Sequence, residues 1–400
     1  MQNQLSIFVF VVCGGREHID TLHFSLKALR KFSQKEIIVI TDLSRNEIPI
    51  EFDRVIDTKT PEHLNHHQAS IYIKTGIHKF LPKGNLYCYI DTDVVALSTD
   101  VDQIFHHFKA PITFASDHCK TTVFSPHAVN CNCFEQNKKD LEELKILEEK
   151  YSHNYTITDS TLLAKQQVLF KKFNEIKRNK LNYLFISLRF LTTWKTFKLD
   201  EDIFYNRWKK HWFDSKGEVI LYDKPKDYYK LIEENSKWRW NSIRQRWISS
   251  KGDDVYELKC NHLTDYISEK FKIEVKEKNW QHWNGGVFLF DDTASDFLSA
   301  WHEKTLAIFN DPKWKTRDQG TLIASAWQYK LQKQPLLPIE FNFLADYNHP
   351  TMLYKGNLQF SFGGVKKTYS PKFAHIYHHW GDEQWEVWRD VSKLFQKSNA

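Results

Sequence analysis

The chain has 400 residues, of which 41% are hydrophobic and 26% are charged. This composition supports a folded core and excludes a fully disordered protein. No run of about 18 apolar residues is present, which excludes an ordinary transmembrane helix. The net charge of +6 is concentrated in residues 165–212, which hold 12 Lys or Arg and 4 Asp or Glu. All 14 tryptophans lie at or after Trp194, so the chain has two compositional regimes.

The apolar runs and amphipathic segments of the first part alternate regularly. Strands are expected over 6–13, 36–42 and 86–90, with helices over 21–32 and 70–81 between them. This alternation predicts a βαβ-type parallel sheet, in which ligands bind at the carboxyl ends of the strands. The pattern is lost after about residue 115, where one charged helix is expected over 138–150. It returns with a strand over 285–290 and helices over 297–309 and 318–331.

These observations predict one α/β domain with a large insertion. The expected division is a first half over 1–114, a mostly helical insertion over 115–275, and a second half over 276–400. The six cysteines do not form a dense disulfide framework, which indicates a reducing, cytoplasmic environment. Cys131 and Cys133 are separated by one residue, but no second cysteine pair follows, so the sequence does not favour a zinc site there.

The strongest chemical feature is Asp-Thr-Asp at 91–93, directly after a buried apolar strand. Two carboxylates at a strand-ending turn can converge on one Mg²⁺ or Mn²⁺ ion, which in turn binds phosphate oxygens. A solvated turn is the plainer interpretation, because Asp-x-Asp is common. The position after the third expected strand of a βαβ unit favours the metal site.

Three later segments carry polar groups or glycines that suit a ligand site. Asn284 precedes Gly285 and Gly286 at the start of an apolar strand, which indicates close backbone approach or simply a tight turn. Asp318 and Gln319 open a helix, where Asp is also an ordinary N-cap. A histidine-rich segment over 375–382 can supply an imidazole to a metal or can be an exposed tail.

In this order the segments resemble retaining GT-A glycosyltransferases of family 8, the glycogenin and lipopolysaccharide galactosyltransferase kind. That family has Asp-x-Asp after a strand, Asn-x-Gly-Val, Asp-Gln about thirty residues later, and a late His-x-x-Gly-x-x-Lys-Pro-Trp. The resemblance covers about 1–110 and 280–385. The Lys-Pro-Trp ending is Gln-Trp here, and the gap between the first two motifs is longer than in the family.

The resemblance implies a GT-A fold, a mixed α/β sheet that binds a nucleotide-diphosphate sugar, expected to be a UDP-sugar. It makes 1–114 the nucleotide-sugar-binding half and 276–400 the half that faces the sugar and the acceptor. It implies Mn²⁺ or Mg²⁺ held by Asp91, Asp93 and His378, with His375 and His379 as alternative ligands. It also implies donor binding by the residues Gly14, Lys74, Asp91, Asn284, Gly285 and Gly286. Asp318 and Gln319 would lie near the reacting carbon, and no nucleophile is assigned.

The predicted function is therefore metal-dependent transfer of a sugar, with retention, to a glycan or lipid-linked acceptor in a bacterial polysaccharide pathway. An inverting GT-A enzyme is an alternative within the same class and would need a carboxylate base, for which Asp292 or Asp318 is a candidate. A non-catalytic carbohydrate- or nucleic-acid-binding protein is the alternative from another class. It would have no need of the Asp-x-Asp motif, and no nucleic-acid partner is expected.

The aromatic residues and the basic segment suggest further surfaces. Trp280, Trp283, Trp380 and Trp385 flank the glycine and histidine motifs and are candidate walls for the donor or acceptor sugar. The basic stretch 165–212 is interleaved with aromatic residues and could face an acidic glycan or, from the cytoplasm, an anionic membrane. A solvated helix face explains the same charges equally well.

Overall fold

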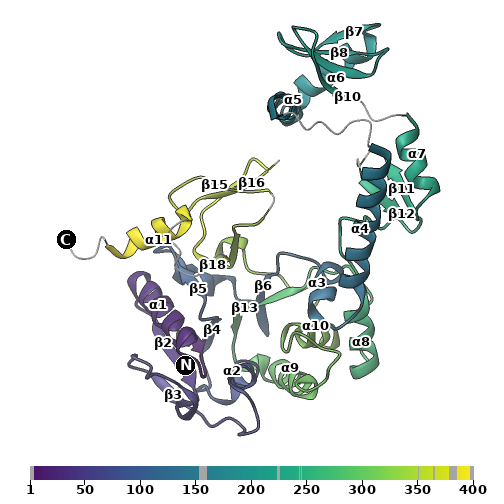
Figure 1. Cartoon of the computed structure of the whole chain (residues 1–400). Coiled ribbons are helices and arrows are strands. Elements are labelled where there is room, and N and C mark those ends of the chain that lie inside the picture. Colours follow the sequence, from purple (N-terminus) through teal and green to yellow (C-terminus); the bar gives the residue numbers. More distant parts are fainter. Residues whose placement is uncertain are drawn as a thin grey trace. The chain divides into compact units, whose positions relative to one another are not determined.

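The computed structural model describes residues 4–152, 160–222, 226–242, 244, 246–349, 351–363, 365–377 and 385–396. Two compact units make up the chain (Figure 1). Unit 1 comprises residues 1–131 and 259–400, and unit 2 comprises residues 132–258. Unit 2 lies within the range 115–275 that the sequence analysis assigns to the insertion.

The central sheet of unit 1 has six strands in the order β3-β2-β1-β4-β13-β6. These strands are β1 (Ser6–Val11), β2 (Glu36–Thr41), β3 (Val55–Asp57), β4 (Leu86–Ile90), β6 (Ile112–Ser116) and β13 (Trp283–Phe290). The first four are parallel, whereas β13 runs antiparallel to both of its neighbours, β4 and β6. This arrangement confirms the predicted mixed α/β fold class.

Helices and a small sheet cover the two faces of this sheet. Ile7, Val9 and Val11 of β1 pack into one core, and the alternate residues Phe8 and Phe10 pack into the other, as the period of two in a strand requires. The first core is shared with α2 (His66–Thr75), α3 (Thr121–Ala128), α8 (His262–Phe271), α9 (Ser295–Ile308) and α10 (Gln319–Gln328). The second is shared with α1 (Arg16–Phe32) and α11 (Glu386–Gln396).

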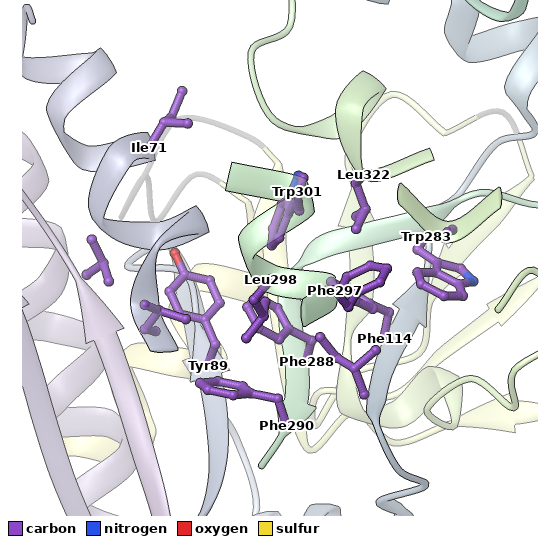
Figure 2. Packing of buried hydrophobic residues seen from close by; sticks show 14 of the residues in the cluster. Ile71, Tyr89, Phe114, Trp283, Phe288, Phe290, Phe297, Leu298, Trp301 and Leu322 are labelled. Atoms are coloured by element: carbon purple, nitrogen blue, oxygen red, sulfur yellow. The ribbon is translucent and has the colours of Figure 1, made fainter. Parts of the chain in front are cut away.

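Large aromatic side chains dominate the first core, as Figure 2 shows. Trp283 is stacked on Phe114 with a centroid distance of 5.0 Å, and Phe114 is also stacked on Phe288 at 4.7 Å. Trp280 is buried in the same core, and Trp385 is buried in the other. The prediction that these three tryptophans form sugar-binding walls is therefore wrong, because their rings stabilise the core; Trp380 lies outside the described residues.

A second, three-stranded sheet of unit 1 has the order β14-β18-β5, formed by β14 (Phe343–Asp346), β18 (Phe373–Tyr377) and β5 (Val94–Ala96). Strand β5 begins directly after the Asp-Thr-Asp turn. The antiparallel pairing of β18 with β5 places His375 opposite Val94. A hairpin-like sheet of β15 (Met352–Tyr354), β16 (Phe360–Phe362) and β17 (Thr368–Tyr369) lies between β14 and β18 in the sequence.

Unit 2 contains helices, as predicted, together with short antiparallel strands that the sequence analysis did not anticipate. The helices are α4 (Cys133–Ser152), α5 (Ser160–Arg178), α6 (Lys180–Thr192) and α7 (Lys226–Glu234). The strands are β7 (Thr196–Lys198), β8 (Ile203–Asn206), β9 (His211–Asp214) and β10 (Val219–Tyr222) in one sheet, and β11 (Trp238–Asn241) and β12 (Arg246–Ser249) in another. Within the described residues of either unit, no helix is long and apolar enough to cross a membrane.

Candidate functional site

The Asp-Thr-Asp turn lies at the carboxyl end of β4, against the glycine-containing start of β13. Because β13 runs antiparallel to β4, the start of one strand meets the end of the other, and the Asp91 amide donates to the Gly286 carbonyl at 2.8 Å. From the opposite face, the Ser25 hydroxyl of α1 donates to the Thr92 carbonyl at 2.6 Å. Two separate backbone contacts thus fix the turn that carries both carboxylates.

The buried Lys74 contacts both Asp91 and Asp318, the residue directly before α10. The Lys74 ammonium, at the end of α2, lies 3.1 Å from Oδ1 of Asp91 and 3.2 Å from Oδ2 of Asp318. Burial lowers the pKa of Lys74, but the charges of the two carboxylates outweigh this effect and raise it, so the ammonium stays protonated. The Asp318 side chain makes no capping hydrogen bond to α10, which argues against the plain N-cap interpretation.

The second carboxylate of the turn faces a buried histidine of β18. His375 Nδ1 lies 3.3 Å from Oδ1 of Asp93, whose side chain is 51% exposed. Burial lowers the pKa of His375, but the charge of Asp93 raises it above its ordinary value. Burial by itself would raise the pKa of Asp93, but the charge of His375 brings it below its usual range. Neither ring nitrogen of His375 has a well-formed hydrogen bond within the described part of the chain.

The paired glycines allow these side chains to approach the backbone of β13. A Cβ on Gly286 would lie 2.6 Å from Nε2 of His375, and one on Gly285 would lie 3.4 Å from the Gln319 amide and 3.6 Å from the Lys74 ammonium. In the orientation that satisfies both partners, the Gln319 amide donates to the Trp283 carbonyl at 3.1 Å and accepts from the Gly285 amide at 3.0 Å. Gly286 is thus required by close packing, as the paired-glycine pattern indicated.

Asn284 is occupied by contacts within the protein. Its side-chain oxygen accepts from the Gly286 amide at 2.8 Å and from the Asn342 amide at 3.1 Å, and its nitrogen donates to Asp117 at 3.1 Å. Asp117 was missed by the sequence analysis. It directly follows β6, which is parallel to β4, so it reaches the same edge of the sheet as Asp91; this is the signal that could have identified it. Burial raises the pKa of Asp117, but its hydrogen bond to His118 holds it well below its usual range.

A cavity of about 320 Å³ adjoins the Asp-Thr-Asp turn at the end of β1. Its lining comprises Val11, Val12, Cys13, Gly15, His18, His66, His67, Ser70 and Thr92. Gly14 has a φ of +101°, and a Cβ there would lie 2.6 Å from the ring of His66, so only glycine suits this position. Thr92, which stands between the two aspartates, is one of the lining residues, so the cavity adjoins the turn that carries them.

The structure therefore brings together Lys74, Asp91, Asp93, Gly285, Gly286, Asp318 and Gln319, with Gly14 beside the adjoining cavity. The predicted metal ligand His378 lies outside the described residues, as does the alternative His379. Of the three histidines considered, His375 is the one whose position beside Asp93 is described. Asp292 follows the opposite end of β13 and accepts from the Gly84 amide at 2.7 Å, so its predicted role as an alternative base is wrong.

No protein-family model matches the chain, and no curated protein matches it. Solved structures with partial likeness are apo glycosyltransferases. The WbbM bifunctional enzyme is 10% identical with a TM-score of 0.41, covering 100% of this chain and 50% of its own. Mouse xyloside xylosyltransferase 1 is 8% identical with a TM-score of 0.36, covering 93% of this chain and 98% of its own. GlyE of Streptococcus pneumoniae TIGR4 is 16% identical with a TM-score of 0.22. The likeness covers 28% of this chain and 29% of GlyE.

The chain thus spans half the length of WbbM. Because all three TM-scores are below 0.5, these likenesses carry no argument for a function.

Proposed function

We propose that this protein is a metal-dependent glycosyltransferase that uses a nucleotide-diphosphate sugar. The observation that carries the proposal is the Asp-Thr-Asp turn at the end of β4. It presents Asp93 beside His375 and lies next to a cavity of about 320 Å³. Small-molecule sites usually measure about 300–1,000 Å³, so this volume suits the nucleoside part of such a donor. The diphosphate would then lie beside the aspartates.

The residues of the turn fit a hard divalent cation. Asp93 is half-exposed, so its carboxylate oxygens are accessible. His375 Nδ1 lies 3.3 Å from Oδ1 of Asp93, close enough for both atoms to bind the same ion. Carboxylate oxygens suit both Mg²⁺ and Mn²⁺. Mn²⁺, a transition metal, accepts an imidazole nitrogen more readily than Mg²⁺ does, so the histidine favours Mn²⁺. We assign Asp93 and His375 as ligands, with Asp91 as the further carboxylate of the motif. When bound, the ion would stabilise the negative charge of the departing diphosphate.

The remaining residues of the site orient the reacting groups. Lys74 holds Asp91 and Asp318 in place, with Nζ–O distances of 3.1 and 3.2 Å. Asp318, held by Lys74, would accept hydrogen bonds from hydroxyls of the donor sugar, and Gln319 would keep the Gly285 backbone in position. We expect retention, by the family resemblance; an inverting reaction would require Asp318 or Asp117 as a base. The anomeric configuration of the product, followed by NMR, decides between these outcomes.

Thermal shift with candidate donors tests the function. Mn²⁺ with the correct donor should stabilise wild-type protein, by about 2.7 kcal/mol at a hundredfold excess over Kd. Asp93→Asn should lose both this shift and transfer, whereas Asp53→Asn, at an exposed position outside the site, should keep both. Absence of a shift with every nucleotide sugar, or full Mn²⁺-dependent turnover by Asp93→Asn, would refute the proposal.

A peripheral membrane contact through 165–212 is supported by one helix face. Leu181, Leu184, Leu188 and Leu191 of α6 follow one another at spacings of three and four and are all exposed. Trp194, directly after this helix, is 82% exposed. An apolar helical stripe within a basic segment is the pattern of an interfacial helix on anionic lipid. The acceptor would then be lipid-linked at that surface.

Vesicle flotation tests this contact. Wild-type protein should float with anionic phosphatidylglycerol vesicles and not with phosphatidylcholine vesicles. The double variant Leu184→Glu/Leu188→Glu should not float, whereas Leu353→Glu, at an exposed position of unit 1, should behave as wild type. Equal flotation of the double variant would exclude the α6 face as the contact.

A further inference from the structure

A second group of metal-ligand side chains lies in unit 1, away from the Asp-Thr-Asp turn. It forms where the chain leaves unit 1 after α3 and returns to it before α8. Cys131 comes from the first segment, and Cys260 and His262 come from the second. Their ligand atoms all lie within 4.8 Å of one another, and all three residues are half-buried. Cys131 precedes Cys260 by 129 positions in the sequence, yet the two thiols and the imidazole converge on one point.

The packing of α3 against α8 fixes this arrangement. The Cys260 amide donates to the Thr122 carbonyl at 3.0 Å, and the Ser125 hydroxyl lies 3.0 Å from the Cys260 sulfur. The same hydroxyl accepts from the Leu263 amide at 2.9 Å, which ties down the first turn of α8 next to His262. Cys260 and the first turn of α8, which begins with His262, are therefore held in place by hydrogen bonds to α3.

The distance between the two sulfurs is informative. Cys131 Sγ and Cys260 Sγ are 4.0 Å apart. Two thiolates bound at about 2.3 Å to one tetrahedral zinc ion stand about 3.8 Å apart. A disulfide would require about 2.05 Å. The observed separation therefore matches two ligands of a shared ion better than a covalent pair.

The sequence around these residues supplies a fourth ligand. Cys131 begins a Cys-Asn-Cys segment that ends at Cys133, and Cys260 begins a Cys-Asn-His segment that ends at His262. Two residues span at most about 7 Å of chain, so Cys133 stays within reach of any ion on Cys131. Three thiolates and one imidazole make up a common closed set of structural zinc ligands.

We propose that Cys131, Cys133, Cys260 and His262 bind one structural zinc ion that fastens the exit and return of the chain at unit 1. All four positions of a tetrahedral ion are filled by protein, so the ion has no open coordination position for catalysis. The site is independent of the proposed donor site, because the two share no residue. Sequence analysis considered only the 131–133 pair and did not find the Cys-Asn-His partner, because 126 residues separate them.

Metal analysis of the full chain, purified under reducing conditions, tests the proposal. Wild-type protein should carry one zinc per chain, and Cys260→Ser and Cys131→Ser should each lose it. Two controls should keep it: Asp93→Asn, in the proposed donor site, and Cys119→Ser, in the separate Asp117–Cys119 group. Loss of zinc from either control and its retention in Cys260→Ser would overturn the assignment.

Measurements on wild-type protein cover the case in which the cysteine variants fail to fold. Cobalt exchanged for zinc should give the intense near-ultraviolet thiolate-to-metal band and the visible absorption of a tetrahedral site. A thiol reagent should titrate three more cysteines after zinc is removed than before. Wild-type protein that binds no zinc when reduced and supplied with it, or a Cys131–Cys260 disulfide in the peptide map of the native protein, would refute the proposal.

Discussion

Replacing Lys74 by methionine removes the cation that joins the two carboxylates of the site while keeping most of the buried side-chain volume. Its ammonium lies 3.1 Å from Asp91 and 3.2 Å from Asp318. At an effective dielectric constant of 20, each contact contributes about 5 kcal/mol of Coulomb attraction, which the desolvation of the charges largely offsets. Removing one partner of a buried ion pair usually costs about 3–5 kcal/mol.

The expected cost lies near the lower end of this range, at about 3 kcal/mol, because the two carboxylates keep 27% and 15% exposure. Urea denaturation followed by circular dichroism measures this cost on the transition of unit 1. Transfer activity should fall as well, since Asp91 and Asp318 would no longer be held.

A double-mutant cycle with Asp318→Asn isolates the pair, whose coupling energy should exceed about 1 kcal/mol. The exposed pair of Lys278 and Asp265, with a distance of 3.3 Å, is the matched control and should couple by less than about 1 kcal/mol. Equal coupling in the two cycles, or a cost of Lys74→Met below about 1 kcal/mol, would refute the reasoning that the bridge is buried and structural.

Three further predictions concern buried or closely packed positions of unit 1. A Cβ added by Gly286→Ala would lie 2.6 Å from Nε2 of His375 and should displace that ring. The variant should therefore weaken Mn²⁺-dependent donor binding at least tenfold in thermal-shift titrations. The control Gly363→Ala, whose added Cβ has no contact closer than 3.5 Å, should leave donor binding unchanged. Burial lowers the pKa of His302 to about 4, so its stabilising effect is complete above about pH 6.5 and is lost as the pH falls toward 4. Wild type should therefore lose up to about 3 kcal/mol more than His302→Gln between these pH values in urea titrations. Asn342→Ala removes the amide that donates to Asn284 at 3.1 Å and should cost about 1–2 kcal/mol, measured by the same denaturation.

The sequence was sufficient to predict elements whose pattern is local. The helices expected over 21–32, 138–150 and 297–309 are present as α1, α4 and α9 with extended or slightly shifted ends. The Asp-Thr-Asp turn was predicted at the end of a buried strand and is found at the end of β4. In each case the apolar period and the flanking polar residues lie within one stretch of chain, so neighbouring residues suffice for the prediction.

Features that depend on distant pairing were not predictable in the same way. His375 could not be distinguished from His378 or His379, because its place beside Asp93 follows from the register of β18 against β5. Trp283 was expected to face a sugar because it adjoins Asn284, yet alternation along β13 turns it into the core. The strands of unit 2 are only three or four residues long, too short for a clear period of two.

The charges of the site predict that the donor and the metal ion affect each other's affinity. Asp91, Asp93 and Asp318 contribute three negative charges, and Lys74 contributes one positive charge. With His375 neutral, as a metal ligand must be, the site carries a net charge of −2, which a divalent cation balances. A donor diphosphate, itself negative, would be repelled by the site without that cation. Donor and Mn²⁺ should therefore bind with positive coupling, and each should tighten the other by the same factor.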